Sequence, residues 1–244
     1  MAGYRRGLRL RGGVVVVAGA AGPVGRETAR ALAEAGARPV LREPAGSLPD
    51  ADAVRDAARA VVARYGRLDG WVQYPSATAS GGLLDLPLDQ LRSVLDADLL
   101  GAVHAARAAL PHMVAQRRGV LVVVVPVHAQ VARPFGAPPG MAGAAVRVMA
   151  AALRQELRLD GVRGVAVTTV LAPPAAFDEA DRTFPRGSVE RVAATVLAQL
   201  RHPRLEKVAG GPLTKALVHG HALVPGVTER LVALRAARQP APRS

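Results

Sequence analysis

The stretch VVVVAGAAGPVG, residues 14–25, decides how the rest of the chain is interpreted. Its first four residues form an uninterrupted β-branched run, a pattern typical of a strand buried on both faces of a parallel sheet. Residues 19–22 then make a turn, and a helix is predicted from about Val24 to Ala35, with Gly36 as its C-terminal cap. A glycine turn between such a strand and a helix offers backbone N–H groups where a dinucleotide pyrophosphate can bind.

Along the rest of the chain, segments with a strand pattern alternate with segments with a helix pattern. Further strands are expected at 39–41, 70–74, 120–125, 165–171 and 205–208, and further helices at 51–65, 88–115, 142–159 and 189–200. The strand at 120–125 is the most apolar and should be central, and Pro111 should kink or end the helix that contains it. The order implies right-handed crossovers and an α/β fold, a doubly wound parallel sheet of the Rossmann type in a single domain.

The domain boundaries follow from this order. Residues 1–12 are assigned to a basic N-terminal segment, residues 13–238 to the Rossmann-type domain and residues 239–244 to a frayed tail rich in Pro and Arg.

The composition restricts the classes of function. The chain has 244 residues, half of them apolar, which suits one domain with a sizeable core. The absence of Cys excludes disulfides, thiolate catalysis and Cys-based zinc sites, and we expect no metal. No stretch is apolar enough over a sufficient length to span a membrane, and the run after the first arginines is too short for a signal peptide. A cytoplasmic protein is therefore expected.

The net charge of +13 raises the question of an anionic partner. Only Lys207 and Lys215 are lysines, and the many arginines accompany abundant Ala, which indicates a GC-rich coding sequence. No aromatic residues interleave with the arginines as a stacking platform. We therefore predict a solvated basic surface or an acidic partner, and no nucleic acid.

Five segments carry a resemblance to a known family: 65–69, 105–113, 119–125, 153–157 and 161–165. They resemble corresponding parts of the classical short-chain dehydrogenases/reductases, and the likeness covers nearly the whole chain except for a gap after the second strand. Gly210-Gly211 and the helix around 227–235 resemble a C-terminal extension of some members. The resemblance implies an oxidoreductase that uses NAD or NADP to move hydride between C4 of nicotinamide and a carbonyl or alcohol carbon.

The family's catalytic side chains are missing here. In the family a Tyr exchanges the proton, a Lys four residues later lowers the pKa of that Tyr and holds the nicotinamide ribose, a Ser orients the substrate oxygen, and an Asn holds a relay water. No Tyr-x-x-x-Lys pair exists, because Leu8, Asp69 and Thr78 stand four residues after the three tyrosines. Aligned by the resemblance, the Tyr, Lys, Ser and Asn positions fall on Pro139, Gly143, Pro126 and Asp98.

The resemblance assigns the cofactor site to Gly19, Gly22, Gly25 and Glu43. The middle glycine of the family's fingerprint falls on Pro23, which removes a backbone donor.

Other family cofactor positions also differ. Glu43 would bind a ribose 2′-OH and favour NAD, whereas Arg42 favours NADP, and the choice stays open. The segment after the 70–74 strand and the Pro173-Pro174 pair also depart from the pattern, and the adenine-contacting position falls on Ser47.

Two functions remain in view. The first is a catalytically inactive pseudoenzyme that serves as a binding, scaffold or partner subunit, in a homo-oligomer or with an active relative. Its contacts would run through the helices at 88–115 and 142–159. The second is an active oxidoreductase in which Asp98, His128 and Tyr74 meet at the carboxyl edge of the sheet and a His–Asp pair replaces the tyrosine.

Two further features have ordinary explanations. His104 and His112 lie eight residues apart on one predicted helix, where packing or surface placement is expected because a metal would need more ligands. Val227, Leu231 and Leu234 form an apolar stripe beside arginines, which could dock on the domain or a subunit, or rest on an anionic membrane.

Overall fold

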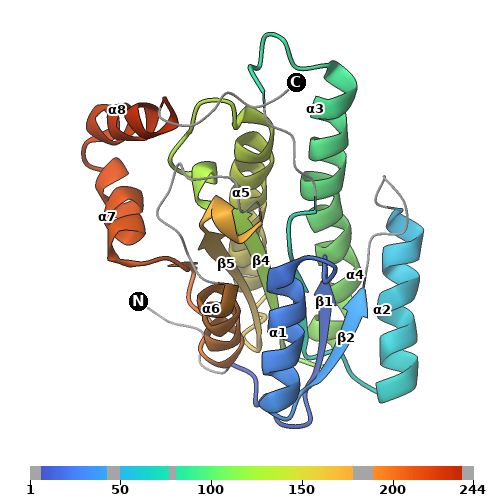
Figure 1. Ribbon diagram of the computed structural model, residues 1–244. Coiled ribbons are helices and arrows are strands. Elements are labelled where there is room, and N and C mark those ends of the chain that lie inside the picture. Colours follow the sequence, from blue (N-terminus) through green and yellow to red (C-terminus); the bar gives the residue numbers. More distant parts are fainter. Residues whose placement is uncertain (1–6, 43–49, 77–80, 178–188, 238–244) are drawn as a thin grey trace.

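The computed structural model describes residues 7–42, 50–76, 81–177 and 189–237. Within these ranges the chain forms one parallel sheet in the order β2-β1-β3-β4-β5-β6, with helices on both faces (Figure 1). The prediction of a doubly wound α/β fold is therefore confirmed.

The strands differ in how deeply they are buried. They are β1 (Val14–Ala18), β2 (Arg38–Arg42), β3 (Gly70–Gln73), β4 (Gly119–Pro126), β5 (Val165–Ala172) and β6 (Glu206–Val208). Strand β4 lies between β3 and β5 and is buried at every position, as its apolar sequence predicts. Strand β2 forms one border of the sheet, and residues 43–49 after it, with the predicted sites Glu43 and Ser47, lie outside the described residues.

Two apolar cores fill the space on the two faces. Along β1, Val14 and Val16 enter one core while Val15 and Val17 enter the other, since successive side chains of a strand point to opposite faces. Helices α1 (Pro23–Glu34) and α6 (Val189–Arg201) cover one face. Helices α2 (Ala51–Tyr65), α4 (Gly101–Ala115) and α5 (Ala137–Leu159) cover the other.

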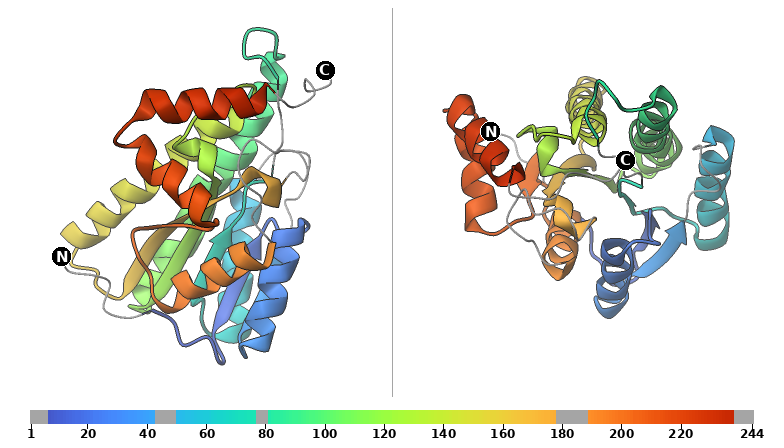
Figure 2. Two further views of the ribbon diagram at one scale, coloured as in Figure 1. Left: turned by 60° about the vertical axis from the view of Figure 1, so that its left-hand side comes forward. Right: turned by 45° about the horizontal axis from the view of Figure 1, so that its top comes forward.

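Helices α7 (Pro212–His221) and α8 (Pro225–Ala236) follow β6 and lie on the flank of the molecule opposite α2 (Figures 1 and 2). The sequence indicated α8 but not α7.

The long helix predicted at 88–115 is divided into three parts. It begins as α3 (Leu88–Val94), passes through a π-helical segment η1 (Leu95–Leu100) and continues as α4. Pro111 lies inside α4, which runs on to Ala115, so the prediction that Pro111 could end the helix is wrong. The π-helical segment contains Asp98, and such segments are frequent at functional sites.

The described part of the predicted N-terminal segment packs onto the domain. Leu8 and Leu10 are buried in the core shared with α1 and α6, and the Leu8 N–H donates to the Leu200 carbonyl at 2.7 Å.

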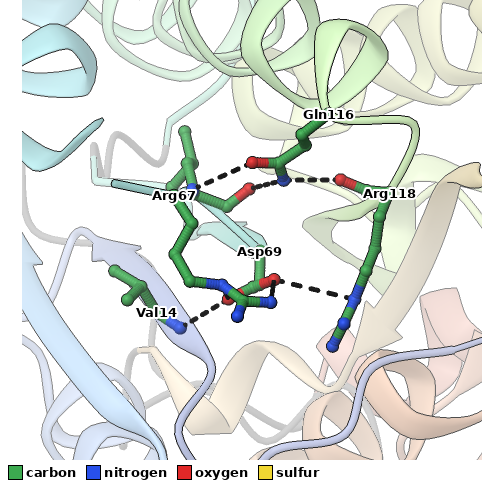
Figure 3. Close-up of polar contacts among 6 residues, drawn as sticks. Val14, Arg67, Asp69, Gln116 and Arg118 are labelled. Atoms are coloured by element: carbon green, nitrogen blue, oxygen red, sulfur yellow. Dashed lines mark hydrogen bonds and ion pairs between the residues drawn. The ribbon is translucent and has the colours of Figure 1, made fainter. Parts of the chain in front are cut away.

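A buried carboxylate joins the amino ends of neighbouring strands (Figure 3). Asp69 is fully buried just before β3, and its Oδ2 accepts the Val14 N–H of β1 at 2.9 Å. Arg67 donates to both carboxylate oxygens, at 2.7 and 2.5 Å, and Arg118, just before β4, lies 3.7 Å from Oδ1. The Gln116 side chain donates to the Leu68 and Arg118 carbonyls and completes the connection.

We expect Asp69→Asn to lower the free energy of unfolding by about 2–4 kcal/mol, because it leaves two arginines without their buried counter-charge. Urea unfolding followed by circular dichroism measures this. Asp56→Asn is the matched control, because Asp56 and Arg59 form an exposed pair and the change should stay within about 0.5 kcal/mol. Equal effects of the two substitutions would contradict the role given to Asp69.

Candidate functional site

The glycine turn keeps the shape that its sequence predicts. Gly19 has φ of +80°, and a Cβ there would lie 3.0 Å from the Cβ of Tyr74. At Gly25 a Cβ would lie 2.5 Å from the Cα of Ala20, so α1 packs on the turn without space for a side chain. Both glycines are therefore required by the turn itself, whatever it binds.

The outer part of this turn is open. Gly22 caps the start of α1 and has no other atom within 4 Å of where its Cβ would be. Pro23 follows at the first helical position and offers no N–H, which leaves Val24 and Gly25 as first-turn donors. The exposed Arg26 donates to the Ala21 carbonyl and adds a positive charge beside the turn. The sequence pattern gave no indication that Arg26 lies beside the turn.

The four positions assigned to the family's catalytic residues lie together. Asp98, Pro126, Pro139 and Gly143 line one cavity, along with Gln73 and neighbouring apolar residues. The cavity measures about 10 Å³, which is room for about one water molecule. Three of these four residues have no side chain that exchanges a proton.

Gly143 is closed in by its neighbours. A Cβ at this position would lie only 2.7 Å from the Cβ of Ala129 and 3.4 Å from the Cδ of Pro126. Ala129 belongs to the short 3-10 helix η2 (Val127–Ala129), on which α5 rests directly. A lysine cannot occupy position 143 unless α5 and η2 move apart.

Asp98 has a contact that orders the backbone. It is mostly buried, and its Oδ1 accepts the N–H of Ser76 at 2.7 Å, in the segment after β3. Its carboxylate therefore fixes the loop at the carboxyl end of β3 against the π-helical segment.

His128 is enclosed without a hydrogen bond to either ring nitrogen. Burial, together with the positive charge of Arg133, lowers the pKa of His128 to about 3, so the imidazole is neutral at physiological pH. The His–Asp pair considered as a replacement for the tyrosine is therefore not joined by a hydrogen bond to the imidazole.

Tyr74 lies on the other face of the sheet. It belongs to the core beneath α1, and its hydroxyl is 2.5 Å from Oγ1 of Thr28. Burial raises the pKa of Tyr74 above its ordinary value. The predicted meeting of Asp98, His128 and Tyr74 is therefore wrong, because the Tyr74 side chain enters the core beneath α1 whereas Asp98 lines the cavity next to α5.

The other predicted features remain structurally ordinary. His104 and His112 are partly buried on α4, and no group of three potential metal ligands occurs in the described ranges.

The apolar residues Val227, Leu231 and Leu234 are exposed along α8. No helix in the described part of the chain is long and apolar enough to cross a membrane.

Comparison with known proteins identifies the family. The chain is 25% identical to dehydrogenase/reductase SDR family member 7B of Bos taurus over a 270-residue alignment that covers 94% of this chain and 83% of the relative. It is 26% identical to an uncharacterized oxidoreductase of Listeria monocytogenes over 193 aligned residues, covering 70% of this chain and 77% of the relative. A crystal structure of a short-chain dehydrogenase from Streptomyces avermitilis shares the fold with a TM-score of 0.73, at 20% identity over 88% of this chain and 94% of that one. The family model described as short chain dehydrogenase matches residues 44–180, and the chain belongs to that family.

Proposed function

We propose that this chain is a non-catalytic member of the family that serves as a binding or partner subunit. The observation that carries the proposal is the packing of Gly143 on Ala129, with 2.7 Å between the Ala129 Cβ and the position a Cβ at 143 would take. If only the lysine side chain had been exchanged, the site would still have room for a different catalytic side chain. Here the space for the lysine is filled by the Ala129 methyl group of η2, which packs directly on α5.

The residues present fit only part of the family's cofactor. Gly22 and the first turn of α1 suit a pyrophosphate, and Arg26 adds positive charge beside them. At the reacting end, Pro139 supplies no phenol and Gly143 no ammonium to hold a ribose. The site therefore does not fit the nicotinamide half of the cofactor, and we propose no hydride transfer by this chain.

The available titratable groups do not replace the missing ones. His128 is enclosed with a depressed pKa, and the Tyr74 hydroxyl is engaged with Thr28. The remaining candidate for an acid or base is Asp98, and its carboxylate already accepts the Ser76 N–H. This favours the inactive protein over an oxidoreductase with replacement residues.

Cofactor titration tests the loss of the reaction. We expect no oxidation of NADH or NADPH with carbonyl substrates, and we expect ADP to bind within about threefold of NADH, which is a difference of less than 1 kcal/mol. Calorimetry measures the binding and absorbance the turnover. Turnover that disappears in His128→Ala or Asp98→Asn would show instead that these residues perform catalysis.

Substitution of Gly143 tests the closed packing. In an open helix, Gly→Ala stabilises by up to about 1 kcal/mol, but here the methyl group meets Ala129, so Gly143→Ala should destabilise by about 1–3 kcal/mol. Ala129→Gly in the same chain should recover part of that loss, as denaturant unfolding would show.

Gly220→Ala on α7 is the matched control, because nothing lies within 4 Å of the position of its Cβ, and it should cause no loss. If Gly143→Ala is as well tolerated as the control, the site has more room than proposed. Turnover gained by Pro139→Tyr with Gly143→Lys would also count against the closed site.

The partner role predicts association through α4 and α5. The apolar side chain of Val148 is 70% exposed on α5, and small residues such as Ala144 and Ala145 allow another helix to approach closely. We expect light scattering to show an oligomer at micromolar concentration, and Val148→Asp to shift it toward the monomer. Val227→Asp, on α8, should leave the mass unchanged. A wild-type monomer would refute self-association.

A further inference from the structure

The amino edge of the sheet is strongly basic and carries 11 of the 32 basic residues of the chain. This edge, at the bottom of Figure 1, consists of the connections that precede the six strands together with the adjoining ends of five helices and the first residue of β2, which are residues 7–13, 34–38, 64–69, 115–118, 158–164 and 201–205. Its arginines are Arg9, Arg11, Arg38, Arg64, Arg67, Arg117, Arg118, Arg158, Arg163, Arg201 and Arg204. Its acidic residues are Glu34, Asp69 and Asp160, so the 11 arginines and 3 acids give a net charge of +8.

The opposite edge has no such excess. The described connections that leave the carboxyl ends of the strands are residues 19–22, 74–76, 81–87, 127–136, 173–177 and 209–211. They contain one arginine, Arg133, and one acid, Asp85. A coding bias toward arginine would raise the number of arginines at both edges of the sheet. Composition alone therefore does not explain why the positive charge gathers at the amino edge.

Most of the arginines at the amino edge are available to a partner. Arg67 and Arg118 pair with the buried Asp69, and Glu34 pairs with Arg30 of α1. The other nine arginines are exposed and form no ion pair within the described residues, and Arg64 stacks over the ring of Tyr65. The edge therefore presents guanidinium groups whose charge the protein does not neutralise.

Two exposed leucines lie among these arginines. Leu159, at the end of α5, is 86% exposed, and Leu205, just before β6, is 56% exposed. The Arg154 guanidinium donates to the Leu205 carbonyl, which places that residue beside α5. Arg158, Arg163 and Arg204 belong to the same two connections.

We propose that the amino edge binds the surface of an anionic phospholipid bilayer. Arginines would contact lipid phosphates, and Leu159 and Leu205 would enter the layer just below the headgroups, since a surface that mixes cationic and apolar side chains suits this environment. A single-stranded nucleic acid would need stacking aromatics, and Tyr65 is the sole aromatic residue in these connections. The surface lies on the edge opposite the candidate site, so it is independent of the proposed loss of catalysis.

Vesicle sedimentation tests this proposal with the full chain. We expect binding to vesicles of phosphatidylcholine with phosphatidylglycerol, little binding to phosphatidylcholine alone, and weaker binding as salt rises. Each of Arg163→Gln and Arg204→Gln should lower the partition coefficient about fivefold, as expected for a basic residue at a membrane surface. Leu159→Ser with Leu205→Ser should weaken binding at high salt, where charge contributes least.

The control is Arg230→Gln with Arg235→Gln, which removes two positive charges from α8, one more than either single variant, and should still change partitioning less than about twofold. Thermal melts confirm that each variant is folded. Failure to bind anionic vesicles at low salt would overturn the proposal, as would equal losses in the control. Tighter binding to duplex DNA or polyglutamate than to the vesicles would overturn it in favour of another polyanion.

Discussion

The buried carboxylate of Asp69 is the interaction on which the arrangement of the sheet depends. It accepts the Val14 N–H and pairs with Arg67 and Arg118, and so it joins the amino ends of β1, β3 and β4. Parallel strands are not connected by tight hairpins, so contacts at their ends act together with the ladder hydrogen bonds to fix how far each strand is shifted along its neighbour. With the amino ends joined, the carboxyl ends and the loops that follow them have defined positions.

Because all the described strands run in the same direction, their amino and carboxyl ends form two opposite edges of the sheet. The two edges carry different kinds of residues. The carboxyl edge holds the glycine turn and the cavity between Asp98 and Gly143, and the connections described there have balanced charge. The amino edge holds Asp69 inside and uncompensated arginines outside. A site for small molecules and a charged surface for a large partner can therefore coexist without competing for the same residues.

Under the proposed function, the candidate site shows how a catalytic centre can close while the fold is kept. Gly25 keeps α1 tightly packed on the glycine turn, because a Cβ there would meet Ala20. Gly143 does the same for α5 on η2, with Ala129 as the neighbour. In the first case close packing maintains the glycine turn, and in the second it fills the space beside position 143.

The sequence by itself determined the fold class, the order of the strands and of most helices, and the absence of the Tyr-x-x-x-Lys pair. These follow from local patterns: the β-branched run 14–17, the glycine turn after it, and the small number of tyrosines. Only the tertiary structure decided which residues meet. It placed Tyr74 on Thr28 in one core and enclosed His128 elsewhere, because both residues follow their strands in connections whose side chains pack against elements distant in the sequence. It also showed the π-helical turn at Asp98 and the contact of Gly143 with Ala129, since helix packing distances depend on residues far apart in the chain.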